Sequence, residues 1–300
     1  MKQVIVTGAN GFIGSSLIKV LVKKDIKVIA IDLSFVTLRL PENNLITKIE
    51  SDINIKLCEK IPIGEYDAFY HLAWKGVNGI EKTDPIIQLA NIQMTIDCAI
   101  ICKQINCKKL LCAGTIAEQA TFSLPLLERT SSSMMYGVAK HCGHLFLESY
   151  CKNIGLPFVW MQFSNIYGIG NKTGNLVSYV LNEILYGKVA TFGPAEQPYD
   201  FIYIDDLVEA VFRIGVTNNR HDMYYIGSGS PRLLKEYLWR IGEITGLSDK
   251  IKIGLRPDDG IKYSFEMFNV IPLCEDIGEY VSTTFDDGIA KTLKWTKSLS

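Results

Sequence analysis

Short apolar runs alternate with longer amphipathic stretches through the first half of the chain. Runs at residues 3–7, 28–32, 68–72 and 109–113 predict strands. Stretches from about residue 11 to 24 and from about 85 to 105 carry apolar residues at helical spacing, and Pro85 suits the first turn of a helix. This alternation predicts a parallel sheet with helices on both faces.

The second half of the chain has a looser pattern. A helix is predicted from Tyr136 to about residue 154, where Gly155 and Pro157 end it before a strand at 158–163. Further helices are predicted at 176–186, 205–216 and 233–245, between segments rich in Gly, Pro and polar residues. We therefore expect an α/β protein with a Rossmann-type doubly wound parallel sheet in residues 1–165. A smaller mixed α/β substrate lobe is expected mainly in 166–300, interwoven with the first because no linker separates them.

The composition indicates a globular protein without a polyanionic partner. Hydrophobic residues make up 48% of the chain and charged residues 21%, and the formal net charge of −1 leaves no positive field for nucleic acid. No apolar run reaches the roughly 18 residues of a membrane span, and the N-terminus begins directly with a strand pattern. We expect a soluble, cytoplasmic protein with neither a nucleic-acid nor a membrane partner.

The cysteines and histidines do not predict a metal site. Four of the eight cysteines, at 98, 102, 107 and 112, are spaced for a helix and a following strand without close CxxC pairs. Buried, reduced thiols are therefore expected. His141 and His144 lie one helical turn apart, but without an acidic partner near them in sequence they are interpreted as an ordinary helix face.

The segment TGANGFIG, residues 7–14, comes after the first predicted strand and opens the first predicted helix. Gly8 permits a tight turn, Gly11 lets the backbone approach a pyrophosphate, and Gly14 allows close packing of the helix on the strand. The helix N-terminus supplies unpaired N–H donors. In this context the glycine spacing predicts a dinucleotide site, and Phe12 and Ile13 lie within it.

Asp32 ends the second predicted strand, where a carboxylate can accept hydrogen bonds from the adenosine ribose hydroxyls. It would repel the extra phosphate of NADP, so NAD is favoured, although NADP is not excluded. Other residues at strand ends face the same ligand crevice. Candidate dinucleotide contacts there are Asp52, Ile53, Leu72, Ala73 and Trp74.

Tyr136 and Lys140 form YGVAK at the start of a predicted helix, so their side chains lie on one face a turn apart. A tyrosine hydroxyl has a pKa near 10, and acid–base work near neutrality requires a pKa lower by roughly 3. A neighbouring ammonium acts in that direction. Thr115 comes after the strand LLCAG, where its hydroxyl can donate to the substrate oxygen that Tyr136 serves. These observations predict Thr115, Tyr136 and Lys140 as catalytic residues.

Together these residues resemble the extended short-chain dehydrogenase/reductase family, the NAD-dependent epimerase/dehydratase type that modifies nucleotide sugars. The resemblance covers nearly the whole chain, and HLAW at residues 71–74 is similar to the family's HLAA. It implies that Asn91 joins Tyr136 and Lys140 in the cofactor site. It also implies that Asn165 in SNIYG and Arg256 contact a nucleotide-diphosphate sugar, with Thr115 at the sugar. The family further implies a homodimer formed by pairing the helices at about 85–105 and 136–154.

Departures from the family pattern narrow the reaction. Nucleotide-sugar 4,6-dehydratases place Asp-Glu directly after the catalytic Ser/Thr, whereas Ile-Ala occupies these positions after Thr115, which disfavours dehydration. Many 4-epimerases have Ser-Ser before that residue and Val-Tyr-Gly after it, whereas this chain has Ala-Gly before Thr115. Gln162 and Tyr199 stand where many relatives have arginine.

The leading hypothesis is an NAD(P)-dependent 4-ketoreductase that passes hydride to C4 of a nucleotide-linked 4-keto-6-deoxyhexose. The tryptophan after HLA and the short chain are similar to such reductases. A nucleotide-sugar 4-epimerase uses the same residues twice and stays open as the alternative. A catalytically silent dinucleotide sensor is a third hypothesis, but it has little need for Thr115, Tyr136 and Lys140 together.

Overall fold

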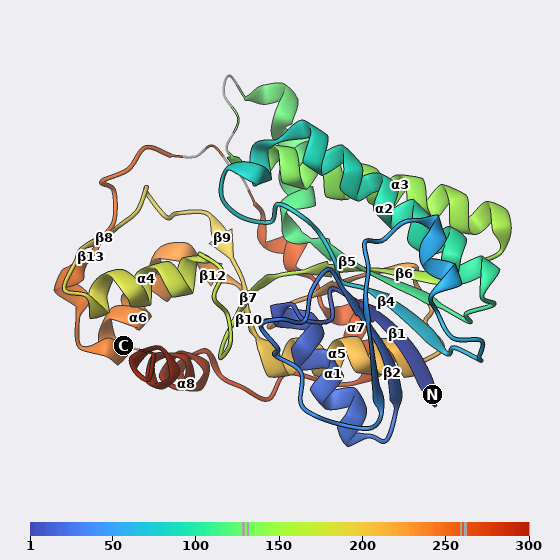
Figure 1. Cartoon of the computed structure of the whole chain (residues 1–300). Helices are drawn as coiled ribbons and strands as arrows, with labels where there is room; N and C mark the ends of the chain where they lie inside the picture. Colours follow the sequence, from blue (N-terminus) through green and yellow to red (C-terminus); the bar gives the residue numbers. More distant parts are fainter. Residues whose placement is uncertain (128–129, 131, 259, 261–262, 300) are drawn as a thin grey trace.

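Seven parallel strands form the central sheet, in the order β11-β6-β5-β4-β1-β2-β3 (Figure 1). The computed structural model describes residues 1–127, 130, 132–258, 260 and 263–299. The strands are β1 (Gln3–Thr7), β2 (Lys27–Asp32), β3 (Ile46–Glu50), β4 (Ala68–His71), β5 (Leu110–Thr115), β6 (Phe158–Phe163) and β11 (Met223–Ile226). The strand order reverses between β1 and β4, which creates a crevice at their carboxyl ends. This doubly wound Rossmann-type sheet confirms the predicted fold class.

Helices cover both faces of the sheet (Figure 1). α1 (Phe12–Lys23) and α5 (Ile204–Val216) pack together on one face, and α2 (Pro85–Gln104) and α3 (Ser132–Ile154) on the other. β4 and β6 are buried along their whole length, because each side of these strands faces a helical layer. A hydrophobic core therefore lies on each side of the sheet.

A second lobe lies at one end of the sheet (Figure 1). It contains α4 (Leu176–Leu185), α6 (Leu234–Thr245), α8 (Phe285–Lys297) and the strand pairs β8 (Ala190–Thr191) with β13 (Ile251–Lys252) and β9 (Pro198–Tyr199) with β12 (Arg232–Leu233). The parallel pair β7 (Asn165–Tyr167) and β10 (Phe201–Tyr203) links it to the sheet, and α7 (Ile271–Ile277) returns to pack on α5 and β11. Short 3-10 helices complete the fold: η1 (Ile55–Glu59), η2 (Ile80–Thr83), η3 (Ile116–Leu126), η4 (Ser248–Lys250) and η5 (Phe265–Phe268).

The chain crosses the predicted domain boundary at residue 165 more than once, since α5 and β11 return to the sheet. The boundary itself stays a prediction. No apolar run predicts β3 or β11, although Asp52 is predicted to lie at the end of a strand. α3 begins at Ser132, before the predicted start at Tyr136, and Thr115 is the last residue of β5 rather than the residue after it.

α2 is long and apolar enough to cross a membrane by length and composition alone. In the fold it lies against α3, β4 and β5, and its buried side chains include Ala99 and Ile101. Packing on the sheet therefore accounts for part of its apolar character, while Ile86 and Leu89 are exposed. Cys98 and Cys102 of α2, Cys107 and Cys112 are buried free thiols, as predicted.

Candidate active site

The glycine motif forms a tight turn between β1 and α1. Gly8 has a φ of +65°, and a Cβ there would lie 2.8 Å from the backbone nitrogen of Ala73. A Cβ on Gly14 would lie 2.1 Å from the carbonyl oxygen of Gly8, so only glycine fits at both positions. Gly11 caps α1 without a side-chain hydrogen bond. The turn thus leaves the first N–H groups of α1 available to an anionic group, as the motif predicts.

Asp32 lies beside this turn at the end of β2. Its carboxylate accepts hydrogen bonds from the backbone N–H groups of Asn10 and Leu33, both at 2.8 Å. Asn10 is not among the predicted site residues, although it lies inside the glycine motif. Its side-chain oxygen accepts the N–H of Arg39 at 2.9 Å, and the Arg39 guanidinium donates to the carbonyl of Gly170 at 3.0 Å. The loop after β2 is therefore tied both to the glycine motif and to Gly170.

The other predicted dinucleotide contacts lie at the ends of β3 and β4, on either side of β1 and β2. Asp52 is exposed after β3 and accepts the N–H of Ile53 at 3.0 Å. Leu72 and Ala73 come after β4, and their backbone lies directly against Gly8. The structure thus brings these residues to the carboxyl edge on which β1 and β2 also end, which is the edge expected for a ligand.

Asn91 has a supporting contact in the structure. Its side-chain NH₂ donates to the carbonyl of Lys75 at 2.8 Å, and its oxygen accepts the N–H of Lys75 at 2.8 Å. The side chain is buried on α2, with an exposed fraction of 2%. Asn91 therefore clamps the loop after β4, and its predicted contact with a cofactor stays a prediction.

Thr115, Tyr136 and Lys140 come together where β5 ends against α3. The Thr115 side chain forms a hydrogen bond with Tyr136. The Lys140 ammonium donates to the carbonyl of Ala113 at 2.6 Å and lies 3.6 Å from the centre of the Trp74 ring. The same indole is 6.2 Å from the Tyr136 ring in an edge-on arrangement. Trp74 thus contacts both members of the YGVAK pair.

Burial dominates the protonation of these groups. It lowers the pKa of Lys140 to about 7, against the opposing influence of the Glu118 charge. It also raises the pKa of Tyr136 above the ordinary value, and the hydrogen bond with Thr115 opposes that rise. The expectation that Lys140 lowers the phenol pKa is therefore corrected: desolvation of the ring hydroxyl is the larger effect.

Glu118 is a site residue that is absent from the sequence prediction. Its carboxylate accepts the backbone N–H of Thr115 at 2.7 Å and the Trp160 indole N–H at 3.1 and 3.0 Å. A Cβ on Gly114 would lie 2.2 Å from the Trp160 nitrogen and 2.8 Å from the Glu118 oxygen, so this contact requires glycine. Burial raises the pKa of Glu118 to about 7. The available signal was Thr115-x-x-Glu118, the spacing of a capping box, which η3 forms.

The predicted substrate residues lie beyond the sheet. Asn165, at the start of β7, donates to the carbonyl of Asp200 at 3.1 Å and accepts the Tyr199 hydroxyl at 2.9 Å. Arg256 is exposed in the second lobe and donates to the hydroxyls of Thr191 and Tyr179 at 2.8 and 2.6 Å. Asn165 and Arg256 are thus each held by their own neighbours, and their contacts with a nucleotide sugar stay predictions.

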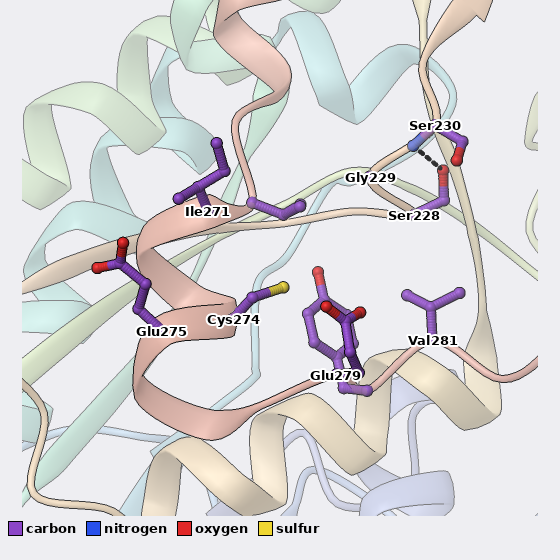
Figure 2. Close-up of a pocket in the computed structure, with 10 residues that line it drawn as sticks. Ser228, Gly229, Ser230, Ile271, Cys274, Glu275, Glu279 and Val281 are labelled. Atoms are coloured by element: carbon purple, nitrogen blue, oxygen red, sulfur yellow. Dashed lines mark hydrogen bonds between the residues drawn. The ribbon is translucent and has the colours of Figure 1, made fainter.

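A cavity of about 560 Å³ lies between the end of β11 and α7 (Figure 2). Ser228, Gly229 and Ser230 line one side, and Cys274 with Glu279 lines another. None of the predicted catalytic or cofactor residues lines it. The cavity is therefore distinct from the crevice at the strand ends, where the chemistry-bearing side chains gather.

Comparison with known proteins identifies relatives along most of the chain. Residues 4–227 match the family described as the NAD dependent epimerase/dehydratase family. The putative UDP-glucose 4-epimerase of Methanocaldococcus jannaschii is 24% identical, with 99% of each chain covered. The dTDP-4-dehydro-6-deoxyglucose reductase of Escherichia coli is also 24% identical, over 97% of this chain and 96% of the relative.

Among solved structures, one similar chain is the UDP-N-acetylglucosamine 4-epimerase from Methanobrevibacter ruminantium M1, solved in complex with UDP-N-acetylmuramic acid. It has a TM-score of 0.82 and 24% sequence identity, and the match covers 100% of this chain and 99% of that one. At this identity the likeness shows a shared fold.

Proposed function

Because the chain belongs to the NAD dependent epimerase/dehydratase family, we propose that it is a nucleotide-sugar 4-ketoreductase. In this reaction hydride passes from the reduced nicotinamide to C4 of a nucleotide-linked 4-keto-6-deoxyhexose, and the ketone becomes a hydroxyl. The coarser assignment, an extended short-chain dehydrogenase/reductase that modifies nucleotide sugars, comes from the family. The choice of reduction rests on the residues around Thr115.

The two residues directly after Thr115 carry the proposal. Ile116 is buried, with an exposed fraction of 3%, and packs with Tyr225 and Phe268, and the next residue is Ala117. Neither side chain can take or give a proton, so the acid–base pair needed to eliminate water is missing at this point. Simple transfer of hydride and one proton remains the reaction that Thr115, Tyr136 and Lys140 support best.

Each predicted site residue would have a separate role in this reaction. Gly8, Gly11 and Asp32 would hold the dinucleotide, which when bound supplies the hydride. Tyr136 would protonate the C4 oxygen, because its hydroxyl is kept in the neutral, proton-bearing form by burial, which raises its pKa. Thr115 would orient the same oxygen through its contact with Tyr136. Lys140 would hold the nicotinamide ribose and place positive charge near the phenol as the proton leaves.

A 4-epimerase is the second candidate. It is favoured by the names of relatives that match almost the whole chain, among them the archaeal putative epimerase. Such an enzyme would keep its dinucleotide throughout the reaction. It would return the hydride to C4 after the keto-sugar intermediate has rotated in the site. The Ala-Gly before Thr115 supports the reductase instead, because many 4-epimerases have serines there.

One experiment separates the two candidates. The purified protein is incubated with NADH or NADPH and a panel of nucleotide-linked 4-keto-6-deoxyhexoses, and separately with UDP-glucose and UDP-galactose. A reductase consumes the reduced dinucleotide in proportion to the 4-hydroxy sugar formed. Interconversion of the UDP-hexoses with no consumption of dinucleotide on any keto sugar would contradict our proposal and support the epimerase.

A further inference from the structure

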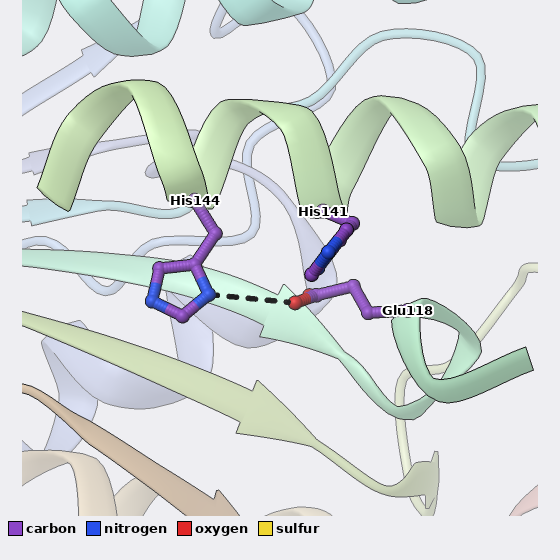
Figure 3. A group of neighbouring side chains, drawn as sticks. All are labelled: Glu118, His141 and His144. Atoms are coloured by element: carbon purple, nitrogen blue, oxygen red, sulfur yellow. Dashed lines mark ion pairs between the residues drawn. The ribbon is translucent and has the colours of Figure 1, made fainter. Parts of the chain in front are cut away.

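Three side chains with metal-binding atoms converge behind Thr115, on the side of β5 that faces α3 (Figure 3). Glu118 comes from η3, and His141 and His144 come from one face of α3. Their ligand atoms all lie within 4.8 Å of one another. Figure 3 shows the Glu118 carboxylate directed toward the His144 ring, with the His141 ring beside it. We propose that Glu118, His141 and His144 bind one transition-metal ion.

The site is largely shielded from water. Glu118 has an exposed fraction of 1% and His144 of 8%, while His141 is half-buried. Burial of the charged Glu118 carboxylate has a cost in desolvation free energy. A cation bound between this carboxylate and the two imidazoles would offset that cost. The half-buried ring of His141 leaves a route by which an ion can enter.

A carboxylate lies near each ring nitrogen of His144. The His144 ring turns Nδ1 toward Glu118, at 4.0 Å, and Nε2 toward the Glu148 carboxylate, at 3.9 Å. A metal-bound histidine usually donates its other ring N–H to a carboxylate. Glu148 lies near enough to become this partner of His144 after a small movement of either side chain, because 3.9 Å is longer than a hydrogen bond. The ring also stacks on Trp160, with centroids 4.9 Å apart and an interplanar angle of 5°.

The carboxylate of Glu118 is oriented just as firmly. Trp160 and the backbone of Thr115 donate hydrogen bonds to it, and hydrogen-bonded carboxylates are usual among metal ligands. Bonds of about 2.0–2.2 Å at a tetrahedral angle would place the ligand atoms about 3.4 Å apart. Since the ligand atoms lie up to 4.8 Å apart, they must draw together by up to about 1.4 Å, which rotation of the two histidine side chains can supply.

The ligand set indicates the class of ion. Two imidazoles and one carboxylate suit Zn²⁺, Co²⁺ or Ni²⁺, whereas Ca²⁺ and Mg²⁺ prefer oxygen ligands throughout. Three protein ligands leave one position of a tetrahedral ion for water. Because Glu118 also holds Thr115, the ion would tie the end of β5 to α3, the helix that carries Tyr136 and Lys140. The proposal does not depend on which sugar the protein acts on.

The experiment uses the untagged full-length protein, freed of metal by a chelator and titrated with Co²⁺ alone. The chain has four histidines, so single substitutions can test the site fully. His144→Phe retains an aromatic ring against Trp160, and His141→Gln changes a half-buried residue. His221→Gln is the matched control, because His221 is exposed and lies outside the cluster.

We expect one equivalent of Co²⁺ to give the visible absorption of a four-coordinate ion, and Zn²⁺ to abolish it by displacement. His141→Gln and His144→Phe should each weaken binding at least about tenfold, while His221→Gln should leave it unchanged. Circular dichroism checks that the variants are folded. Absence of the visible band, wild-type affinity in both cluster variants, or an absorption dominated by thiolate-to-cobalt charge transfer would overturn the proposal.

Discussion

The ammonium of Lys140 lies 3.6 Å from the centre of the Trp74 ring. Lys140 is buried, with an exposed fraction of 3%, and it donates a hydrogen bond to the carbonyl of Ala113. The indole is itself held by a hydrogen bond from its N–H to Gln88 at 2.9 Å. Trp74 occupies the position at which the family's HLAA has its last alanine. The indole face therefore sets where the lysine ammonium rests.

We predict that Trp74→Ala lowers kcat by about 2- to 30-fold, because a cation–π contact of about 0.5–2 kcal/mol is lost and Lys140 is less firmly placed. Steady-state rates of keto-sugar reduction measure this. Trp239→Ala is the control, since Trp239 is 55% exposed in the second lobe. Equal loss in both variants would show that Trp74 acts through general stability rather than through Lys140.

Substitution of Tyr136 by phenylalanine should separate catalysis from binding. The variant retains the ring that meets Trp74 edge-on but lacks the proton donor, so we expect a loss of about 10²- to 10⁴-fold in kcat. The dissociation constant of NADH, followed by fluorescence, should stay nearly unchanged. Tyr186→Phe, at an exposed position, is the matched control. Full activity of the Tyr136 variant would contradict its role as the proton donor, whereas dinucleotide binding without turnover in the wild-type protein would favour the silent sensor.

Asp32→Asn tests the choice of dinucleotide. The amide removes the negative charge that would face the extra phosphate of NADP, a repulsion of about 1–4 kcal/mol for charges 4 Å apart near a protein surface. The ratio of NAD to NADP affinity should therefore fall at least about fivefold, as measured by titration calorimetry. Asp249→Asn, at an exposed site in the second lobe, should leave the ratio as it is. No change on removing the Asp32 charge would contradict this role.

The buried His71 should make stability depend on pH. Its ring contacts the hydroxyls of Thr7 and Thr95, and burial lowers its pKa to about 3. The unfolded chain takes up a proton near pH 6.5 whereas the folded protein does not until about pH 3. The stabilisation from this group is therefore complete above about pH 6.5 and is lost as the pH falls, by up to about 1.4 kcal/mol per pH unit.

Urea unfolding between pH 7.5 and 5 measures this dependence. In the His71→Asn variant the free energy of unfolding should depend less steeply on pH than in the wild-type protein. Other titrating groups contribute equally to the two proteins, so the difference reports on His71. His221→Gln should retain the wild-type slope, because that ring is exposed. Identical slopes in the wild-type protein and the His71 variant would contradict the prediction.

We also predict a homodimer formed through α2 and α3. These helices leave large apolar side chains exposed, among them Leu89 at 61% and Phe146 at 62%. Light scattering at micromolar concentration should give twice the chain mass, and Phe146→Glu should shift the protein toward the monomer, because a charge in an apolar interface is costly. Ile63→Glu, at a fully exposed loop position, is the control. A monomeric wild-type protein would count against this assembly.

Apolar periodicity predicts β1 and β6 with the bounds that the structure has, because both strands are mainly apolar and lie between helical layers. It does not predict β3. That strand, ITKIE, lies at the sheet edge and is half exposed, so its apolar residues are too few to stand out. β11 is also not predicted, because it is short and leads directly into a glycine-rich loop.

The sequence by itself determined the dinucleotide turn and the spacing of the YGVAK pair, because both are local patterns whose geometry depends on the backbone of a turn or a helix. Only the tertiary structure decided that Lys140 rests on Trp74 and that Glu118 faces His144. These pairs come from different elements, and their contacts depend on how the ends of β4 and β5 meet α3. Burial at that meeting point also sets the protonation of the site, since desolvation depends on the surrounding fold and cannot be read from neighbours in sequence.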